Sequence, residues 1–90
     1  MTNEELAKEI QSGDRDKLLD LWAQVKRFAH NWAYKWTVAL NGRGGLSVDD
    51  FEQAAFLALL EALEGWRPEG GAFLTWYGLR LKSAFSEAAG

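Results

Sequence analysis

Turn-forming residues are concentrated in three short clusters, and their spacing limits what this chain can fold into. The clusters are "SGD" at 12–14, "NGRGG" at 41–45 and "RPEGG" at 67–71. Between them, apolar residues recur every three or four positions, as in amphipathic helices, and no segment shows the alternation of a strand. The sequence therefore predicts an all-α bundle of four helices, at about 2–11, 15–40, 48–64 and 71–88.

The length of the chain allows only one hydrophobic core. A chain of 90 residues buries roughly 60–65% of the surface that it exposes when unfolded. Its composition, with 48% hydrophobic and 26% charged residues, is that of a folded globular protein. We therefore expect residues 1–90 to form a single domain. Because "SEAAG" ends the last helix without a stop signal, we also expect this domain to be excised from a longer protein.

Several functional classes are disfavoured by what the sequence lacks. There is no Cys, so disulfides, thiolate metal sites and Cys nucleophiles are excluded. The first twenty residues are mostly polar or charged, unlike a signal peptide, and no apolar run reaches the roughly 18 residues of a membrane span. We expect a cytoplasmic protein that contacts no membrane.

Polar residues mark where three of the helices should begin. Thr2 and Glu5 match a capping box, in which each side chain bonds the backbone of the other residue. Ser47 and Asp50 match the same pattern at the start of the third helix. Asp14 is the predicted N-cap of the second helix. That helix would be about 39 Å long, longer than its own core needs, so it should present surface to another molecule.

Charge is segregated along the chain, although the net charge is only −3. Residues 21–46 contain four basic residues and no acid, whereas residues 47–69 contain six acids and one base. The two middle helices should therefore present surfaces of opposite sign.

The third helix carries apolar residues on more than one side. We assign its first stripe to the core, namely Phe51, Ala55, Ala58 or Leu59, Ala62 and Trp66. A second apolar stripe contains Phe56, Leu60 and Leu63. The remaining edge is acidic and amide-rich, with Leu57 at its centre. Either both stripes pack against other helices, or one side of the helix binds a partner.

The stretch "DDFEQAAFLALLEALEGWRPEGGAFLTWYGLRLKSAF" resembles region 2 of the bacterial sigma-70 family of RNA polymerase sigma factors. Asp50, Phe51 and Gln53 open the family pattern, "RPEGG" supplies its turn, and Phe73 with Trp76 begins its last helix. This last pair is more similar to the compact alternative (ECF-like) sigma factors than to housekeeping members. The resemblance implies a region 2 fold and a non-enzymatic role in transcription initiation.

The resemblance also implies a docking surface for core RNA polymerase. In the family, the third helix packs in the bundle on one side and docks on the clamp helices of the beta-prime subunit on another. By position, the polymerase-binding residues would be Asp50, Gln53, Leu57, Leu60 and Glu61. At Ala54 the family commonly has Glu, so one charged contact is missing. An anti-sigma factor is a further expected partner.

The fourth helix would recognise and open the promoter −10 element on the non-template strand. Flipped bases need aromatic or apolar contacts, and single-stranded backbone needs cations. The candidate DNA-binding residues are Trp76, Tyr77, Arg80 and Lys82, with Lys26, Arg27, Lys35 and Arg43 as phosphate contacts. Gly78 stands where housekeeping members have a base-stacking Tyr, and Leu79 and Arg80 stand where they have a Trp pair.

An alternative function is a helical interaction module that dimerises through residues 48–64 and never binds DNA. No cofactor, metal or small-molecule substrate is expected. His30 is the only histidine, and without nearby Cys or acid in its own segment it is interpreted as structural. We interpret Trp22, Trp32 and Trp36 as core residues rather than as a platform on which nucleobases stack.

Overall fold

Four α-helices and one short 3-10 turn are present in the part of the chain that the computed structural model describes, residues 1–41 and 45–89. No strand occurs among these residues, so the all-α prediction is confirmed. The elements are α1 (Asn3–Gln11), α2 (Lys17–Leu40), α3 (Val48–Gly65), the 3-10 turn η2 (Pro68–Gly70) and α4 (Phe73–Ala89).

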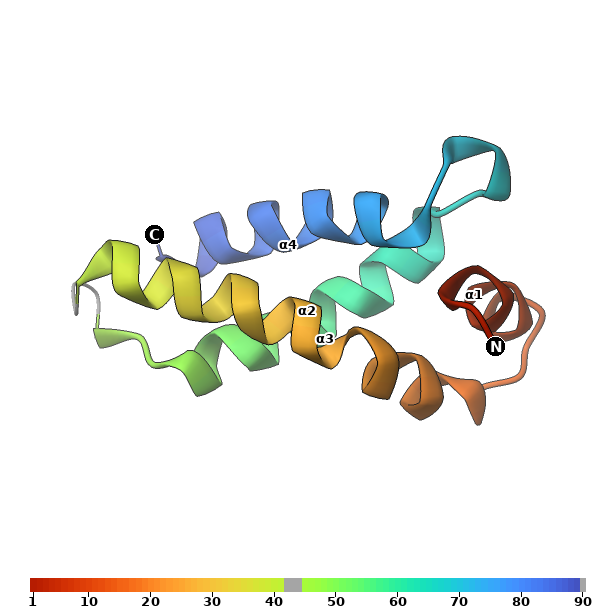
Figure 1. The fold of residues 1–90 in the computed structure, drawn as a ribbon, viewed down its shortest axis with the longest axis horizontal. Coiled ribbons are helices and arrows are strands. Elements are labelled where there is room, and N and C mark those ends of the chain that lie inside the picture. The colour runs from red at the N-terminus through yellow and green to blue at the C-terminus, as the bar shows by residue number, and fades with distance from the viewer. Residues whose placement is uncertain (42–44, 90) are drawn as a thin grey trace.

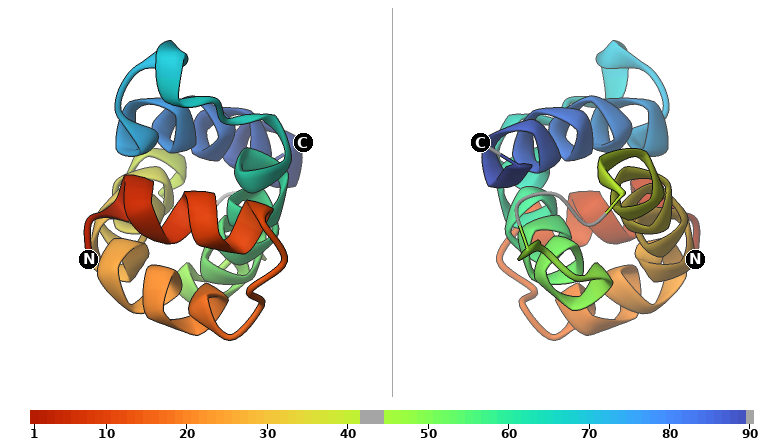
Figure 2. Two further views of the ribbon diagram at one scale, coloured as in Figure 1. Left: turned by 90° about the vertical axis from the view of Figure 1, so that its right-hand side faces the viewer. Right: turned by 90° about the vertical axis from the view of Figure 1, so that its left-hand side faces the viewer.

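Helices α2, α3 and α4 run along the molecule, and α1 lies across one end of them (Figure 1, Figure 2). The chain reverses direction after α2 and again after α3, so α2 and α4 run in the same sense (Figure 1). Helix α2 has 24 residues, which is about 36 Å, and the longest extent of the molecule is 40 Å. On its outer face Tyr34 and Val38 are exposed.

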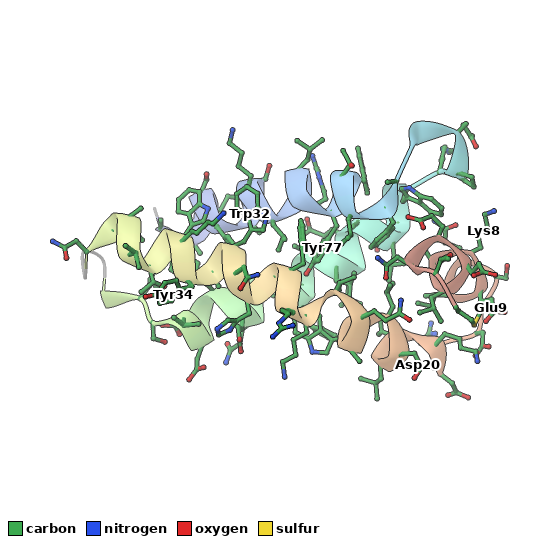
Figure 3. All side chains as sticks on the ribbon, in the orientation of Figure 1. Lys8, Glu9, Asp20, Trp32, Tyr34 and Tyr77 are labelled. Carbon is green, nitrogen blue, oxygen red and sulfur yellow. The ribbon has the colours of Figure 1, made fainter. Side chains whose placement is uncertain are left out.

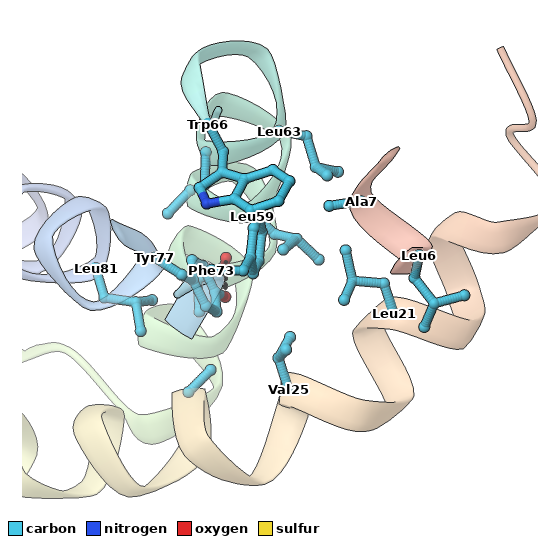
Figure 4. Close-up of a cluster of buried hydrophobic side chains, with 14 of the residues drawn as sticks. Leu6, Ala7, Leu21, Val25, Leu59, Leu63, Trp66, Phe73, Tyr77 and Leu81 are labelled. Atoms are coloured by element: carbon cyan, nitrogen blue, oxygen red, sulfur yellow. Dashed lines mark hydrogen bonds between the residues drawn. The ribbon is translucent and has the colours of Figure 1, made fainter. Parts of the chain in front are cut away.

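The core is apolar and takes side chains from all four helices (Figure 4). The ring of Phe51 meets that of Phe85 edge to face, with centroids 5.2 Å apart, and Trp36 contacts both. The stripe predicted on α3 is confirmed, because every member is buried: Phe51, Ala55, Ala58, Leu59, Ala62 and Trp66. The second apolar stripe is divided: Leu63 is buried, Phe56 is half-buried and Leu60 is exposed.

Both predicted capping boxes are present. Thr2 and Glu5 exchange side-chain and backbone hydrogen bonds of 2.8 and 3.0 Å. Ser47 and Asp50 do the same at the start of α3. These local patterns therefore determine where two helices begin.

The predicted N-cap at Asp14 is wrong. Helix α2 begins at Lys17, and the preceding residue, Asp16, makes no side-chain cap bond. Gly13, at φ +110°, turns the chain after α1. The Lys17 N–H donates to the Asp14 carbonyl at 3.3 Å, so this segment is still part of the turn.

Helix α1 satisfies backbone groups at the ends of two other helices. Glu4 Oε2 accepts a 2.7 Å hydrogen bond from the N–H of Phe73, the first residue of α4. Gln11 Nε2 donates to the carbonyls of Leu63 and Trp66, at 2.9 and 2.8 Å, where α3 ends. Such terminal groups have no partner in their own helix, and a carboxylate is favoured at a helix N-terminus. The crossing of α1 therefore stabilises the connection from α3 to α4.

Tyr77 lies inside the core, which corrects the expectation that it contacts DNA. Its side chain is fully buried, and its hydroxyl donates a 2.7 Å hydrogen bond to the carbonyl of Ala55 on α3. The helical period places it on the same side of α4 as Phe73 and Leu81, which are also buried. Burial raises the pKa of the Tyr77 phenol above its ordinary value of 10.0.

Replacing Tyr77 by Phe should lower the free energy of unfolding by about 1–2 kcal/mol, because a buried hydrogen bond is lost while the ring is kept. Urea unfolding of Tyr77→Phe measures this change. Tyr34→Phe is the matched control, since Tyr34 is 59% exposed and its variant should unfold like the parent. Equal stability of the two variants would contradict a structural role for the Tyr77 hydroxyl.

The same residue predicts a loss of stability at alkaline pH. Because its folded pKa is raised, the folded domain keeps the Tyr77 proton to a higher pH than the unfolded chain does. This stabilisation is full below about pH 10 and is lost as the pH rises above that value. Above pH 10 the unfolding free energy of Tyr77→Phe should fall less steeply than that of the parent, by up to about 1.4 kcal/mol per pH unit. Parallel slopes in urea unfolding would contradict this prediction.

Candidate functional site

The outward side of α3 carries five exposed residues that we call the α3 strip: Asp50, Gln53, Leu57, Leu60 and Glu61. Leu57 is 60% exposed and Leu60 is 37% exposed, although the opposite side of the helix is buried. Exposed leucines surrounded by charged and amide groups have the composition of a protein-binding surface. The structure therefore brings together on one face the five residues that the sequence singles out.

One member of the α3 strip, Asp50, also stabilises the start of the helix. Its Oδ2 accepts hydrogen bonds from the N–H and the hydroxyl of Ser47, at 2.8 and 3.1 Å. The other members of the strip are free of such a role in the described structure: no hydrogen bond or ion pair joins Gln53 or Glu61 side chains to described residues. Changes at Asp50 therefore affect stability as well as the surface, whereas changes at Gln53 or Leu57 affect the surface alone.

His30 pairs with an acid from the neighbouring helix. Its Nδ1 lies 2.5 Å from Glu52 Oε1, and both side chains are partly exposed. The pair links α2 to α3 beside the α3 strip. Within the described residues no group of three or more His, Cys, Asp or Glu side chains could hold a metal ion.

The predicted phosphate contacts do not form one patch. Three of them, Lys26, Arg27 and Lys35, are exposed, and the fourth, Arg43, lies outside the described residues. Lys26 lines a surface hollow between α2 and α3 together with acidic and apolar side chains of both helices. Lys35 is nine residues after Lys26, which is about two and a half helical turns. The two lysines therefore lie on opposite flanks of α2.

Trp76 is half-buried and attached to α3. Its indole N–H donates to the Ala62 carbonyl at 3.1 Å, and a Cβ at Gly65 would lie 3.1 Å from its Cζ2 atom. The guanidinium of Arg80 stacks over the Trp76 ring, 5.1 Å from its centroid. The buried Arg80 Nε has no hydrogen-bond partner among the described residues. Trp76 therefore joins α3 to α4, and the Arg80 guanidinium packs at that junction.

Helices α2 and α4 form a side of the molecule that is poor in acids, with Asp20 at the start of α2 and Glu87 near the end of α4. They lie next to each other along the molecule (Figure 1), and neither residues 21–41 nor residues 73–86 contain Asp or Glu. The acids of residues 47–69 lie on α3 and in the turn after it. The fold therefore defines a helical domain with a cationic side and a separate acidic strip, which is the organisation of a protein that binds both a polyanion and another protein.

Comparison with known protein families identifies this class. The family model for Sigma-70 region 2 matches residues 21–88, which covers α3, most of α2 and all but the last residue of α4. The chain belongs to the sigma-70 region 2 family. Searches of curated proteins and of solved structures found no significant match.

Family membership confirms the predicted role in transcription initiation and the predicted absence of enzymatic activity. Sigma-70 region 2 is a non-enzymatic domain of sigma factors, which act in transcription initiation. Membership implies binding to core RNA polymerase and to promoter DNA. No helix in the described part of the chain is long and apolar enough to cross a membrane.

The double role of Asp50 is testable by stability. Asp50→Ala should lower the free energy of unfolding by about 1 kcal/mol, because the capping box at Ser47 is lost. Asp49→Ala is the matched control, since it removes a neighbouring first-turn acid and leaves the box intact. Urea unfolding of both variants measures the difference. A loss no larger in Asp50→Ala than in Asp49→Ala would contradict the capping role.

Proposed function

We propose that this domain is region 2 of a compact alternative sigma factor. Its α3 strip docks on the clamp helices of the beta-prime subunit, and its α2–α4 side recognises and opens the promoter −10 element on the non-template strand. The observation that carries the proposal is the exposure of Leu57 and Leu60 on a helix whose other side is buried in the core. Such a factor acts in the bacterial cytoplasm.

The composition of the α3 strip supports docking on a helical partner. Its two leucines offer apolar area that a partner would remove from water, and the burial of apolar area favours association. Glu61 and Gln53 offer a charge and an amide that orient basic and polar groups of the partner. An anti-sigma factor that covers the same strip would block docking.

The compact alternative subtype is supported by the start of α4. Phe73 is buried in the core, and its ring lies edge to face with that of Trp66, with centroids 5.7 Å apart. Trp76 is attached to α3 through its indole N–H. In this proposal the two residues stabilise the domain, and DNA contacts fall to Arg80, Lys82 and the cations of α2.

The cationic side supports DNA binding, with unequal roles for its residues. Arg27, Lys35 and Lys82 are exposed on stretches of α2 and α4, residues 21–40 and 73–86, that contain no acid, so they are suited to phosphate contacts. Lys26 shares its hollow with Asp49 and Glu52, whose negative charges oppose the approach of a phosphate. We therefore assign Lys26 a weaker contribution than Lys35.

The exposed leucines also suit a second function, dimerisation of the domain through α3. Two copies joined at Leu57 and Leu60 would bury the same strip that polymerase would cover. Sedimentation of the isolated domain separates the two functions, because a dimer predicts an association that depends on protein concentration. Dimers together with no affinity for polymerase would favour the interaction module.

Leu57→Ala should weaken binding to core RNA polymerase by about tenfold, because a central apolar contact is lost. Binding of the labelled domain to core enzyme, or to the isolated clamp helices, measures the change. Leu79→Ala is the matched control, since Leu79 is 54% exposed on α4 outside the α3 strip, and its variant should dock like the parent. Unaltered docking of Leu57→Ala would exclude the α3 strip as the binding surface.

A further inference from the structure

Two half-buried aromatic residues of α2, Phe28 and Trp32, lie at the junction of α2 and α4. Their rings are close to parallel, with an interplanar angle of 15° and centroids 6.5 Å apart. Trp32 lies between the two helices on the near face of the molecule in Figure 3. Both side chains pack against the core without being fully buried. Part of this aromatic surface is therefore accessible to a ligand.

Gly78 of α4 faces this aromatic pair. A Cβ at Gly78 would lie 3.5 Å from Cζ of Phe28, which is an ordinary contact distance. Phe28 also lies against Tyr77, with ring centroids 6.2 Å apart, so the buried part of the pair is supported by α4. Gly78 has no side chain that could cover the pair. At this point of the junction, the aromatic surface is therefore supplied by Phe28 and Trp32 of α2.

The charges around the pair suit a polyanion. Lys35 follows Trp32 by three residues, and Lys82 follows Gly78 by four, so each lies on the same face as its neighbour. Both lysines are exposed. No Asp or Glu occurs in residues 21–41 or 73–86. A ligand with planar rings and regularly spaced negative charges matches this surface.

We propose that Trp32, supported by Phe28, is a base-stacking residue for single-stranded DNA, with Lys35 and Lys82 as flanking phosphate contacts. This inference rests on the proposed function, because it identifies a part of the same promoter-binding side. Every base has a π-face, so stacking on an aromatic side chain tolerates any sequence. Bases of a duplex are already stacked on each other, and the site therefore favours an unpaired strand.

The test compares two labelled oligonucleotides by fluorescence anisotropy on the whole chain. One is a short oligothymidylate, and the other has the same number of phosphates but abasic sugars. Trp32→Ala should weaken binding of the oligothymidylate at least about fivefold and leave binding of the abasic strand unchanged. Lys35→Ala combined with Lys82→Ala should weaken binding of both strands and reduce the dependence on salt.

Trp22→Ala is the matched control, because Trp22 is a half-buried tryptophan of the same helix on its α3 side, where its ring meets Phe56 edge to face. It should bind both oligonucleotides like the parent. Trp32→Phe should restore most of the affinity for oligothymidylate. Trp32→Leu keeps apolar bulk without an aromatic face and should behave like Trp32→Ala. Circular dichroism checks that each variant is helical.

The proposal is overturned if folded Trp32→Leu binds oligothymidylate like the parent, if Trp22→Ala and Trp32→Ala lose equal affinity, or if the parent does not bind this strand. Polymerase binding is measured on the same samples. If the chain binds polymerase but Trp32 has no effect on DNA, only the stacking site is wrong. If the folded chain binds neither polymerase nor DNA, the proposed function is wrong as well.

Discussion

The register of α4 on α3 is the constraint on which both surfaces depend. Two adjacent residues of α4 donate hydrogen bonds to α3: the Tyr77 hydroxyl to Ala55 and the Trp76 indole N–H to Ala62. These two carbonyls are seven residues apart, or about 10 Å along the helix. A sliding or rotated α4 would leave at least one buried or half-buried donor without a partner. With this register, the side of α3 that carries Ala55 and Ala62 is buried, and Leu57 lies on an exposed side of the helix.

This arrangement places the two proposed binding surfaces on different sides of one small domain. The α3 strip carries acids and leucines, whereas the α2–α4 side carries cations and no acid between residues 73 and 86. In the proposed function, the separation of the α3 strip from the cations of α2 and α4 lets a protein partner and a nucleic acid bind at the same time with little competition. In the proposed function, the exposed apolar area of Leu57 is covered when the protein partner docks.

Much of the fold was predictable because its signals are local. The helix ranges, the capping boxes at Thr2 and Ser47 and the core stripe of α3 follow from residue types at fixed spacings. Asp14 was mispredicted because a turn between two closely packed helices used the residues that an isolated helix would use as a cap. The contacts of Glu4 and Gln11 left no local pattern, since their partners lie 69 and at least 52 residues away in sequence.

The sequence by itself determined the helices, the exposed character of the α3 strip and the segregation of charge, because periodicity and net charge belong to each segment alone. Only the tertiary structure decided that Tyr77 is a core residue, that Trp76 is attached to α3 and that Lys26 lies in a hollow with Asp49 and Glu52. The physical reason is that an aromatic or basic residue on an amphipathic helix can face either a neighbouring helix or water. Packing between helices distant in sequence makes that choice.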